Sequence, residues 1–556
     1  MTSIRYMMLG FALFWQLGAI DAETTFAESE LVDLGLKKQL LVDDLVIADI
    51  ANLTREQGVP TKANEGKPIK FTRRDEEGRE VPCDPWAAFN SPYYDIERDV
   101  FRMWHRLSFN DSQRRKNKDS LTDDDIGLGS GYIRGYSESK DGIHFEFKSE
   151  LKGLTTSGDT NLVVTIDDHE TDPNHRYKIG YDCGGGDNSA AIAFSADGIH
   201  WTPYNDGKPV TYRASDFTNQ IYWDPGVKAY RLITRTDFGG IGGAGPLNHY
   251  VNVKIANGKP MAVRGVRSML NPDIKADPTN WQLEQHWILD GQKAIAPDRP
   301  PIEQLMEDRE YVRQAEKEAA RRQIYFMTDW MHEGIHFGLL AVYEYPTDIS
   351  EGSTEDFETR HERNIENFYI ATCRDGVSWD WQWIYAEKPF VPRGPNGSWD
   401  KDMVFPPNHI VTAHDKHWIY YGGTNERHSA FEYDVWIARS NDVGLAWLRL
   451  DGFVGLVAGE QQGEFTTKPF ELKGKNLEIN LEAADSGWSQ VEVLDKDGQP
   501  IAKFSGENAI KLEGIDSVRA RPQWSSGSDL QELVGTPIRL RFKLQNAKIY
   551  AFQVTR

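Results

Sequence analysis

"SKDGIHF" at 139–145 and "SADGIHW" at 195–201 are two copies of one phrase, and "CRDGVSW" at 373–379 and the looser "SNDVGLAW" at 440–447 repeat it. An Asp side chain in such a phrase can accept a hydrogen bond from the backbone two residues on, and a Gly supplies a positive φ. Each copy therefore predicts a tight turn. The aromatic residue that ends the phrase is expected to begin an outer strand and to pack between repeated units. The phrase thus indicates a repeated architecture and not an active site.

The sequence around each copy can be divided in the same way: an apolar run, an Asp-rich turn, an aromatic run, a third run that ends in the phrase, and a short fourth run. Five such four-strand units fit between Trp86 and about Gly452. The third unit lacks the phrase, and "VRSMLNPDIKADPTNW" stands in its place. Meanders that repeat every 40 to 70 residues or so are typical of a β-propeller. A solenoid of strands is the competing fold, but it would need a more regular spacing than these copies have.

The predicted fold class is all-β, a five-bladed β-propeller followed by a C-terminal β-sandwich. The sandwich is expected because short alternating strands with Gly, Asp and Pro turns fill the last part of the chain. The strand in "KKQLLVDDLVIADI" at 37–50 is expected to pair with the last blade or to cover the base of the propeller. The predicted segments are a signal peptide over 1–22, an N-terminal strand and lead-in over 23–85, the propeller over 86–455 with a helical insertion near 301–322, and the sandwich over 464–556.

The first 22 residues have the anatomy of a secretory signal peptide, with an early Arg5, an apolar run and small residues that end at Ala22. We therefore expect an exported protein, periplasmic or extracellular. No later run approaches the roughly 20 apolar residues of a membrane helix. A formal charge of −22 argues against nucleic acid or an anionic membrane as partner. Three cysteines, Cys83, Cys183 and Cys373, are too few for a disulfide framework and are expected to be structural.

The inner strands of a propeller converge on its axis, so the residues at their entrances surround one funnel. At this point an acidic residue stands shortly before an amide in four units, namely Asp84 and Asn90, Asp159 and Asn161, Asp216 and Asn219, and Asp402 and Asn408. Carboxylates that share a concave site push their pKa values apart, so that one can serve as acid and another as base. This is the equipment of glycoside hydrolysis. The alternative is that these Asp residues cap the turns that enter the strands.

The fourth unit offers Asp329 and Glu333 instead, and two interpretations are open. If "IYFMTDW" is the inner strand, Glu333 lies on its exit turn. If "IHFGLLAVYE" is the inner strand, Glu333 heads it and faces the axis. We adopt the second interpretation, because a Glu-Gly pair that leads directly into a strand places a carboxylate where Gly permits close approach.

The candidate residues follow from this arrangement. The predicted catalytic carboxylates are Asp84, Asp159, Asp216 and Glu333. The predicted substrate-binding residues are Trp86, Asn90, Asn161, Asn219, Trp330, His332, His409 and His428. We expect a carbohydrate substrate and no required cofactor. Metal ligands stay unassigned, with a structural divalent cation as the open alternative.

The chain resembles the five-bladed β-propeller glycoside hydrolases, the superfamily that includes the invertase-like family 32, the arabinanase and xylosidase family 43 and the neoagarobiose-hydrolase family 117. It is more similar still to a group of exported bacterial proteins. The motifs that carry this likeness are "QLLVDD", "YDIERDVFRMWHR", the "DGIHW" phrases, "HEGIHFGLL", "HWIYYGG" and "GTPIRLRFKLQNAKIYAF". The likeness covers essentially the whole chain after the signal peptide.

The resemblance implies an exported glycoside hydrolase that acts on a plant or algal polysaccharide or its oligosaccharides. By position it implies Asp84, or Asp159 in its place, as base, Asp216 as the residue that tunes the pKa, and Glu333 as acid. The chain departs from the invertase-like W-M-N-D-P-N-G motif, since "CDPW" at 83–86 keeps only the D-P.

Two other functions stay open. One is a non-catalytic carbohydrate-binding propeller, because a fold does not determine a function. The other is a sialidase-like hydrolase, because S-x-D-G-x-x-W resembles the sialidase Asp-box. A sialidase would need three arginines, for which Arg235, Arg393 and Arg427 are the candidates, and a Tyr nucleophile.

Overall fold

The chain folds almost entirely into β-strands. The structure, a computed structural model, describes residues 31–109, 132–154, 161–183, 189–211, 218–238, 263–287, 289, 322–344, 365–427 and 441–556. The expected signal peptide lies outside these residues. So does the expected helical insertion, apart from Arg322, which begins a strand. Within the described ranges the one α-helix is α4 (Gln382–Tyr385), and the 3-10 turns are η1 (Asn64–Gly66), η3 (Pro173–His175), η4 (Tyr204–Gly207), η8 (Ala502–Phe504), η9 (Gly506–Asn508) and η10 (Gln531–Leu533).

The first three propeller sheets follow one another along the chain. The first sheet has the order β6-β5-β11-β10-β9-β7, with β8 also on β9. Its strands are β5 (Lys70–Arg74), β6 (Glu80–Pro82), β7 (Asp84–Pro85), β8 (Ser91–Asp95), β9 (Val100–Ser108), β10 (Tyr132–Ser139) and β11 (His144–Glu150). The second is the meander β12 (Leu162–Ile166), β13 (Tyr177–Asp182), β14 (Ala190–Ser195) and β15 (Trp201–Pro203). The third is the meander β16 (Asn219–Asp224), β17 (Ala229–Phe238), β18 (Val263–Asn271) and β19 (Gln282–Trp287).

The fourth sheet begins as the same meander and is then extended. Its order is β20 (Arg322–His332), β21 (Ile335–Glu344), β22 (Ile365–Cys373), β23 (Met403–Phe405), β26 (Gly422–Thr424) and β27 (Asn441–Val443). A shorter sheet has the order β24 (Val411–Ala413), β25 (Lys416–Ile419), β28 (Ala446–Arg449) and β4 (Thr61–Lys62). The strands of the predicted fifth unit are thus divided between two sheets. The fold is propeller-like, and the count of five blades stays a prediction.

The repeated phrase forms the turn that the sequence predicts. In three copies the Asp side chain accepts a hydrogen bond of 2.8 Å from the backbone N–H two residues on, in the pairs Asp141 and Ile143, Asp197 and Ile199, and Asp375 and Val377. The Gly of each copy has a positive φ, 74° at Gly142, 77° at Gly198 and 71° at Gly376. The turn prediction is therefore confirmed for these copies.

These turns also join neighbouring sheets. Trp104 of the first sheet donates its indole N–H to the carbonyl oxygen of Gly198 in the second, at 2.7 Å. Tyr420, which directly follows β25, donates its hydroxyl hydrogen to the carbonyl oxygen of Gly142 in the first sheet, at 3.0 Å. Trp201, which ends the second copy of the phrase, packs in one core cluster with Trp104. The phrase is therefore an inter-sheet contact, as its repetition predicted.

Substitution of Gly198 by Ala should destabilise the propeller, because a Cβ at this position would lie 2.7 Å from the Trp104 ring. We expect a loss of about 1 to 3 kcal/mol from overpacking in addition to the strain of a positive φ. Gly78→Ala is the matched control, since Gly78 has a φ of 76° and a Cβ there would meet nothing within 4 Å. Urea denaturation of both variants checks the prediction, and equal losses would contradict it.

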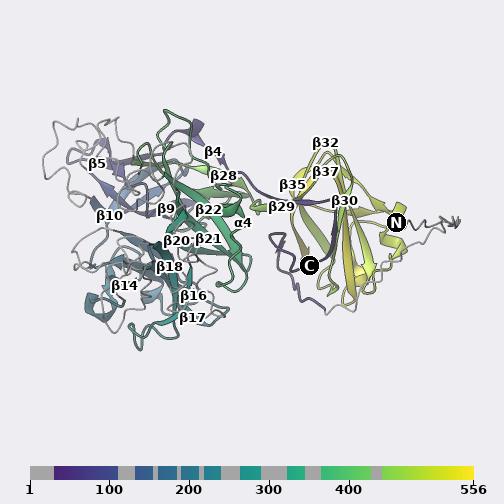
Figure 1. Cartoon of the computed structure of the whole chain (residues 1–556), viewed down its shortest axis with the longest axis horizontal. Helices are drawn as coiled ribbons and strands as arrows, with labels where there is room; N and C mark the ends of the chain where they lie inside the picture. The colour runs from purple at the N-terminus through teal and green to yellow at the C-terminus, as the bar shows by residue number, and fades with distance from the viewer. Residues whose placement is uncertain are drawn as a thin grey trace, which may run out of the picture.

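The N-terminal and C-terminal segments form one further ten-stranded sheet around a single core, the region predicted as a β-sandwich (Figure 1). Its strands are β1 (Gln39–Leu40), β2 (Ile47–Ala51), β3 (Thr54–Gln57), β29 (Val454–Ala458), β30 (Gly463–Thr467), β31 (Phe470–Glu471), β32 (Asn476–Asp495), β34 (Leu512–Glu513), β35 (Asp516–Ala520) and β37 (Pro537–Thr555). The strands β33 (Ala509–Ile510) and β36 (Gln523–Trp524) form a separate pair.

The expected pairing of residues 37–50 with the last blade is wrong. Strand β1 pairs with β37 and β2 pairs with β30, so both belong to the C-terminal sheet. The reason is burial: Leu41, Val46 and Ile47 enter the core cluster of that sheet. The same segment also packs on the propeller, because Leu40 and Val42 share a core cluster with residues of the fourth sheet and Asp43 pairs with Arg374 at 2.8 Å. Further along the lead-in, β4 pairs with β28 and β5 pairs with β11.

Two further expectations concern single residues and helices. Cys83, Cys183 and Cys373 are all buried, which agrees with a structural role. Among the described residues, no helix has the length and the apolar character needed to cross a membrane.

Candidate functional site

Buried amides mark the starts of the inner strands. Exposure of Asn90, Asn161, Asn219 and Asn408 is 2% or less. Asn90 donates from its side chain to the carbonyl oxygen of Ala87 at 2.9 Å, and Asn219 accepts from the Thr234 hydroxyl at 2.7 Å. The predicted recurrence of amides at these positions is therefore real. Their contacts are with protein groups and stabilise the strand starts, and a role in binding substrate stays a prediction for Asn90, Asn161 and Asn219.

A second group of side chains, which we call the entrance cluster, consists of Asp84, Trp86, Arg106, Tyr132 and Arg134. Its members come from β7, β9, β10 and the residue that follows β7. Asp84 pairs with Ser108 and Ser108 with Tyr132, while Arg106 pairs with Arg134. Paired residues, and residues two apart on one strand, share a face of a sheet. The backbone N–H of Trp86 donates to the Arg106 carbonyl at 2.8 Å and continues this arrangement.

The contacts of Arg106 define the centre of the entrance cluster. Its guanidinium lies 4.6 Å from the Trp86 ring centroid and 4.9 Å from that of Tyr132, and the two rings meet edge to face at 5.1 Å. It also donates to the side-chain oxygen of Asn161 in the second sheet at 3.0 Å. The cluster therefore lies where the first and second sheets meet, beside the start of inner strand β12.

Arg134 extends the cluster toward the second sheet. It donates to the backbone oxygen of Asp182 at 3.0 Å, and its guanidinium lies 5.4 Å from the Tyr181 ring centroid. Asp84, Arg106 and Arg134 are all less than 9% exposed. A carboxylate, two guanidiniums and two aromatic faces are thus held together at one end of the propeller sheets.

Of the predicted catalytic carboxylates, Asp84 lies in the entrance cluster. Asp159 and Asp216 lie outside the described residues, as does His428 of the predicted binding set.

The expected position of Glu333 at the head of an inner strand is wrong. Strand β20 is the first strand of its sheet, and Glu333 lies in the turn after it, so the other interpretation holds. Glu333 and Gly334 both have a positive φ, 48° and 76°, which is the geometry of a two-residue hairpin turn. Asp329, four residues before Glu333, exchanges two hydrogen bonds of 2.7 Å with the side chain of Gln220, the residue that follows Asn219 in β16.

Trp330 and His332 lie at the end of β20, close to His409, which directly follows Asn408 and stacks on Tyr93 of β8. The Trp330 ring stacks on His332 at 4.9 Å and meets His409 at 6.1 Å. His332 is hydrogen-bonded to Asp451 at 2.7 Å, and burial lowers the pKa of His409 to about 3. These contacts are with protein groups, and a role in binding substrate stays a prediction for Trp330, His332 and His409.

Three side chains near the end of β20 carry donor atoms that could hold a metal ion. Ligand atoms of His332, His417 and Asp451 lie within 4.8 Å of one another. However, His417 Nε2 accepts a hydrogen bond from the backbone N–H of Asp451 at 2.9 Å, and Lys38 Nζ lies 2.7 Å from the Asp451 carboxylate. Burial alone would raise the pKa of Asp451, but the hydrogen bond from His332 and the charge of Lys38 outweigh it and lower this pKa to about 2. These three side chains therefore suit an ion pair of Asp451 with Lys38 better than a bound metal ion.

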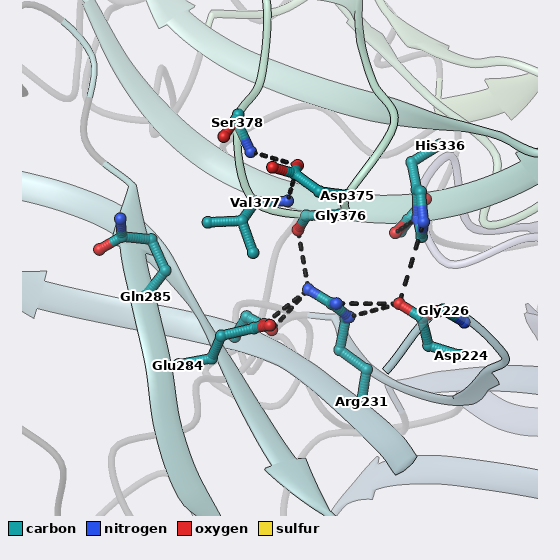
Figure 2. A network of polar contacts seen from close by, with 12 residues as sticks. Asp224, Gly226, Arg231, Glu284, Gln285, His336, Asp375, Gly376, Val377 and Ser378 are labelled. Atoms are coloured by element: carbon teal, nitrogen blue, oxygen red, sulfur yellow. Dashed lines mark hydrogen bonds and ion pairs between the residues drawn. The ribbon is translucent and has the colours of Figure 1, made fainter. Parts of the chain in front are cut away.

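A buried polar network joins the third and fourth sheets (Figure 2). Arg231 lies 2.8 Å from Asp224 and 2.6 Å from Glu284, and it donates to the carbonyl oxygen of Gly376 at 2.8 Å. Asp224 also accepts a hydrogen bond of 2.8 Å from the backbone N–H of Gly226, so it caps the turn that follows β16. The network therefore holds the repeated turn at 373–379, in the fourth sheet, against the third sheet.

His336 extends this network, because its ring lies between the carboxylates of Asp329 and Asp224. Its Nδ1 lies 2.7 Å from Asp329, and its Nε2 lies 3.9 Å from Asp224. Asp329, the other funnel candidate of the fourth unit, is also hydrogen-bonded to the Tyr222 hydroxyl. Asp329 therefore faces the third sheet and belongs to the structural network.

Stability should depend on pH through His336. Burial alone would lower the pKa of His336, but Asp329 and Asp224 outweigh it and raise this pKa. The unfolded value is about 6.5, so the stabilisation is full below that pH and is lost as the pH rises through the higher folded value. Between pH 6 and 9 we expect the melting temperature of the wild-type chain to fall more steeply than that of the His336→Asn variant. The asparagine keeps a hydrogen-bond donor near Asp329 but cannot titrate. Identical slopes in the two proteins would refute this role.

The sequence did not point to several polar residues at the entrance ends. The positions of Tyr132, Arg106 and Arg134 fit the alternation of side chains between the two faces of a strand. The register that pairs β9 with β10 could not be predicted, because a long segment separates the two strands. Glu366 is fully buried in β22, in a row with Tyr343 and Met403 on the neighbouring strands. Cross-strand placement, which a single sequence does not show, is the signal that identifies these residues.

Comparisons with known proteins give structural neighbours only. No family model and no curated protein matches the sequence. One solved structure, described as a glycoside hydrolase, shares 10% identity at a TM-score of 0.40 and covers 70% of this chain and 92% of its own. A β-1,2-mannobiose phosphorylase from Listeria innocua shares 11% at 0.38, over 71% and 98%. A fructofuranosidase from Schwanniomyces occidentalis shares 9% at 0.34, over 89% and 96%. At such identities a likeness assigns no substrate.

Proposed function

We propose that the chain is an exported glycoside hydrolase that cleaves a plant or algal polysaccharide or its oligosaccharides at the entrance cluster. The observation that carries this proposal is the placement of Asp84 on the same face as Trp86, Arg106 and Tyr132. Aromatic rings suit the apolar faces of sugars, and a carboxylate beside them can act as a general base or a nucleophile. Hydrolysis of a glycosidic bond needs a second carboxyl group as acid.

We assign Asp84 as the base of this reaction. Asp159 and Asp216 keep their predicted roles in the proposal, because they precede the buried Asn161 and Asn219 at the starts of β12 and β16. Glu333 is not proposed again as the acid, since it lies in the turn after β20 and not at the head of an inner strand. Glu366 takes its place as the candidate acid, because it is buried at the entrance end of the fourth sheet.

A screen on plant and algal polysaccharides, with detection of new reducing ends, tests the proposal. Release of reducing ends by the wild-type chain and its loss in Asp84→Asn and Glu366→Gln are the expected results. Glycans that bind but are never cleaved would instead support a non-catalytic carbohydrate-binding propeller. Release of sialic acid from sialylated glycans, with loss in Arg235→Gln or Arg427→Gln, would support the sialidase-like alternative.

A further inference from the structure

We propose that residues 450–453, which we call the crossing segment, form an acid-sensitive latch between the propeller and the C-terminal sheet. The neutral ring of His417 holds this latch closed, and a proton on the ring opens it. This change of conformation does not depend on the proposed function, and it requires no cleavage of a glycan.

The crossing segment carries the chain from one part of the fold to the other. It follows β28 of the short propeller sheet and leads into β29 of the C-terminal sheet (Figure 1). All four of its residues are buried. Phe453 packs against the rings of Trp330 at 5.5 Å and His417 at 4.5 Å, and its carbonyl oxygen accepts from the backbone N–H of Gly58 at 2.8 Å. The two parts of the fold are therefore joined by a packed segment and not by an exposed linker.

Asp451 is the residue of the crossing segment that contacts both sides. Its carboxylate lies 2.7 Å from His332 Nε2, at the end of β20, and 2.7 Å from Lys38 Nζ, just before β1 of the C-terminal sheet. Its backbone N–H donates to Nε2 of His417, in β25 of the short sheet, at 2.9 Å. Asp451 is 1% exposed, so water does not replace these partners while the latch is closed.

The hydrogen bond from Asp451 determines the charge of His417. A backbone N–H can only donate, so Nε2 is the unprotonated nitrogen of the ring, and Nδ1 carries the hydrogen that the Thr412 hydroxyl oxygen accepts at 2.9 Å. A second proton would make both ring nitrogens donors. The Nε2–H would then face the N–H of Asp451, and a buried backbone donor would lose its acceptor. The closed latch therefore requires the neutral ring.

The surroundings of His417 add to this preference. Its side chain is fully buried, and burial lowers its pKa well below 6.5, an effect to which His332 contributes. The carboxylate of Asp451 opposes the shift, but the ammonium of Lys38 acts with burial and pairs with that carboxylate. Burial and two neighbouring bases thus outweigh one carboxylate.

Other charges near the latch are paired or act in the opposite direction. Glu333, in the turn after β20, lies 3.7 Å from Lys38. Asp415, in the turn before β25, accepts from Arg519 of the C-terminal sheet at 2.7 and 2.9 Å. A proton on His332 would strengthen its hydrogen bond with the Asp451 carboxylate. Protonation of His417, and not of His332, is therefore the step that weakens the latch.

The sign of the pH dependence follows from the two states of His417. In the open latch the ring meets water and has the ordinary pKa of about 6.5, whereas in the closed latch its pKa is well below that value. The closed latch is therefore fully stable above this pH and is weakened as the pH falls through it, by about tenfold for each further pH unit. Asp451 keeps its charge over this range, since His332 and Lys38 outweigh the effect of burial and lower its pKa to about 2.

Hydrogen exchange of the full chain, measured by mass spectrometry on peptides that contain residues 451–453, provides the first test. After correction for the intrinsic effect of pH on exchange, we expect the protection of these amides to fall about 30-fold between pH 7.5 and pH 5. One proton taken up with a pKa of about 6.5 in the open state gives this factor. Peptides from β13 and β32 are the internal reference and should keep their protection. Protection of residues 451–453 that does not change with pH overturns the inference.

Replacement of His417 separates the latch from a general effect of acid. The amide oxygen in His417→Gln can accept the hydrogen bond from Asp451 but cannot take up a proton, so the protection should no longer fall. Asp451→Asn keeps the backbone donor and suits the positive φ of 56° at this position, so the fall should remain. His200→Gln, at an exposed histidine of the second sheet, is the matched control and should behave as the wild-type chain. A fall that persists in His417→Gln, or that disappears in Asp451→Asn, overturns the role of His417.

Lys38→Met provides a further test that does not need a folded His417→Gln variant. Without the neighbouring ammonium, the closed ring of His417 accepts a proton more readily, so the protection should fall by less than 30-fold over the same range of pH. A fall equal to that of the wild-type chain, or larger, contradicts the latch.

Discussion

Asp84→Asn should lower kcat on any glycan that the wild-type chain cleaves by about 100- to 10,000-fold, the range that a positioned general acid or base contributes. The substitution keeps the size of the side chain and its place in β7 but removes the negative charge. The loss should appear in kcat and in kcat/KM alike, because the carboxylate is needed in the transition state more than in the bound substrate. Initial rates from reducing-end assays on the substrate found in the screen give both constants.

Two controls separate chemistry from folding in this experiment. Asp49→Asn changes an exposed aspartate of β2, in the C-terminal sheet, and should leave both constants unchanged. Circular dichroism and thermal unfolding of Asp84→Asn should match those of the wild-type chain. If Asp84→Asn keeps full activity, Asp84 is not the base, and Asp159 becomes the first candidate.

Arg231→Met should destabilise the propeller by about 3 to 5 kcal/mol, the cost of leaving a buried charge without its partner. Arg231 is fully buried, and its removal leaves Asp224 and Glu284 without the charge that lies within 3 Å of each. It also removes the donor to the Gly376 carbonyl, so the contact between the third and fourth sheets is lost. Urea denaturation, followed by the fluorescence of tryptophans in the propeller sheets, measures the change.

A matched control and a double variant sharpen this prediction. Arg521→Met removes an exposed ion pair with Glu478 and should cost less than about 1 kcal/mol. Arg231→Met combined with Asp224→Leu should recover part of the loss, because replacing both partners of a buried pair costs less than removing one. A loss in Arg231→Met no larger than that in Arg521→Met would show that the network contributes little to stability.

Much of the fold could be predicted from the sequence because its strands and turns are local. The phrase at 139–145, 195–201 and 373–379 contains its own hydrogen-bond acceptor and its own Gly, so the turn forms in the same way in each unit. The third unit was predictable without the phrase, since its alternating runs form β16 to β19. The recurrence of Asp and Asn before the inner strands was also visible, and the buried Asn90 and Asn219 show that it reflects a repeated structural position.

Long-range pairing decided the rest. Residues 37–50 have the composition of a strand, but only the C-terminal core determines that they pair with β30 and β37. Glu333 could head one strand or follow another, and the positive φ of Glu333 and Gly334 settles it as the turn after β20.

The sequence by itself determined the class of fold, the repeated turns and Asp84 as a carboxylate at an entrance. Only the tertiary structure decided which side chains share the face of Asp84, namely Trp86, Arg106, Tyr132 and Arg134. The physical reason is that turn geometry depends on a few adjacent residues. The face on which a strand residue lies depends instead on a cross-strand register, and a shift of one residue reverses it.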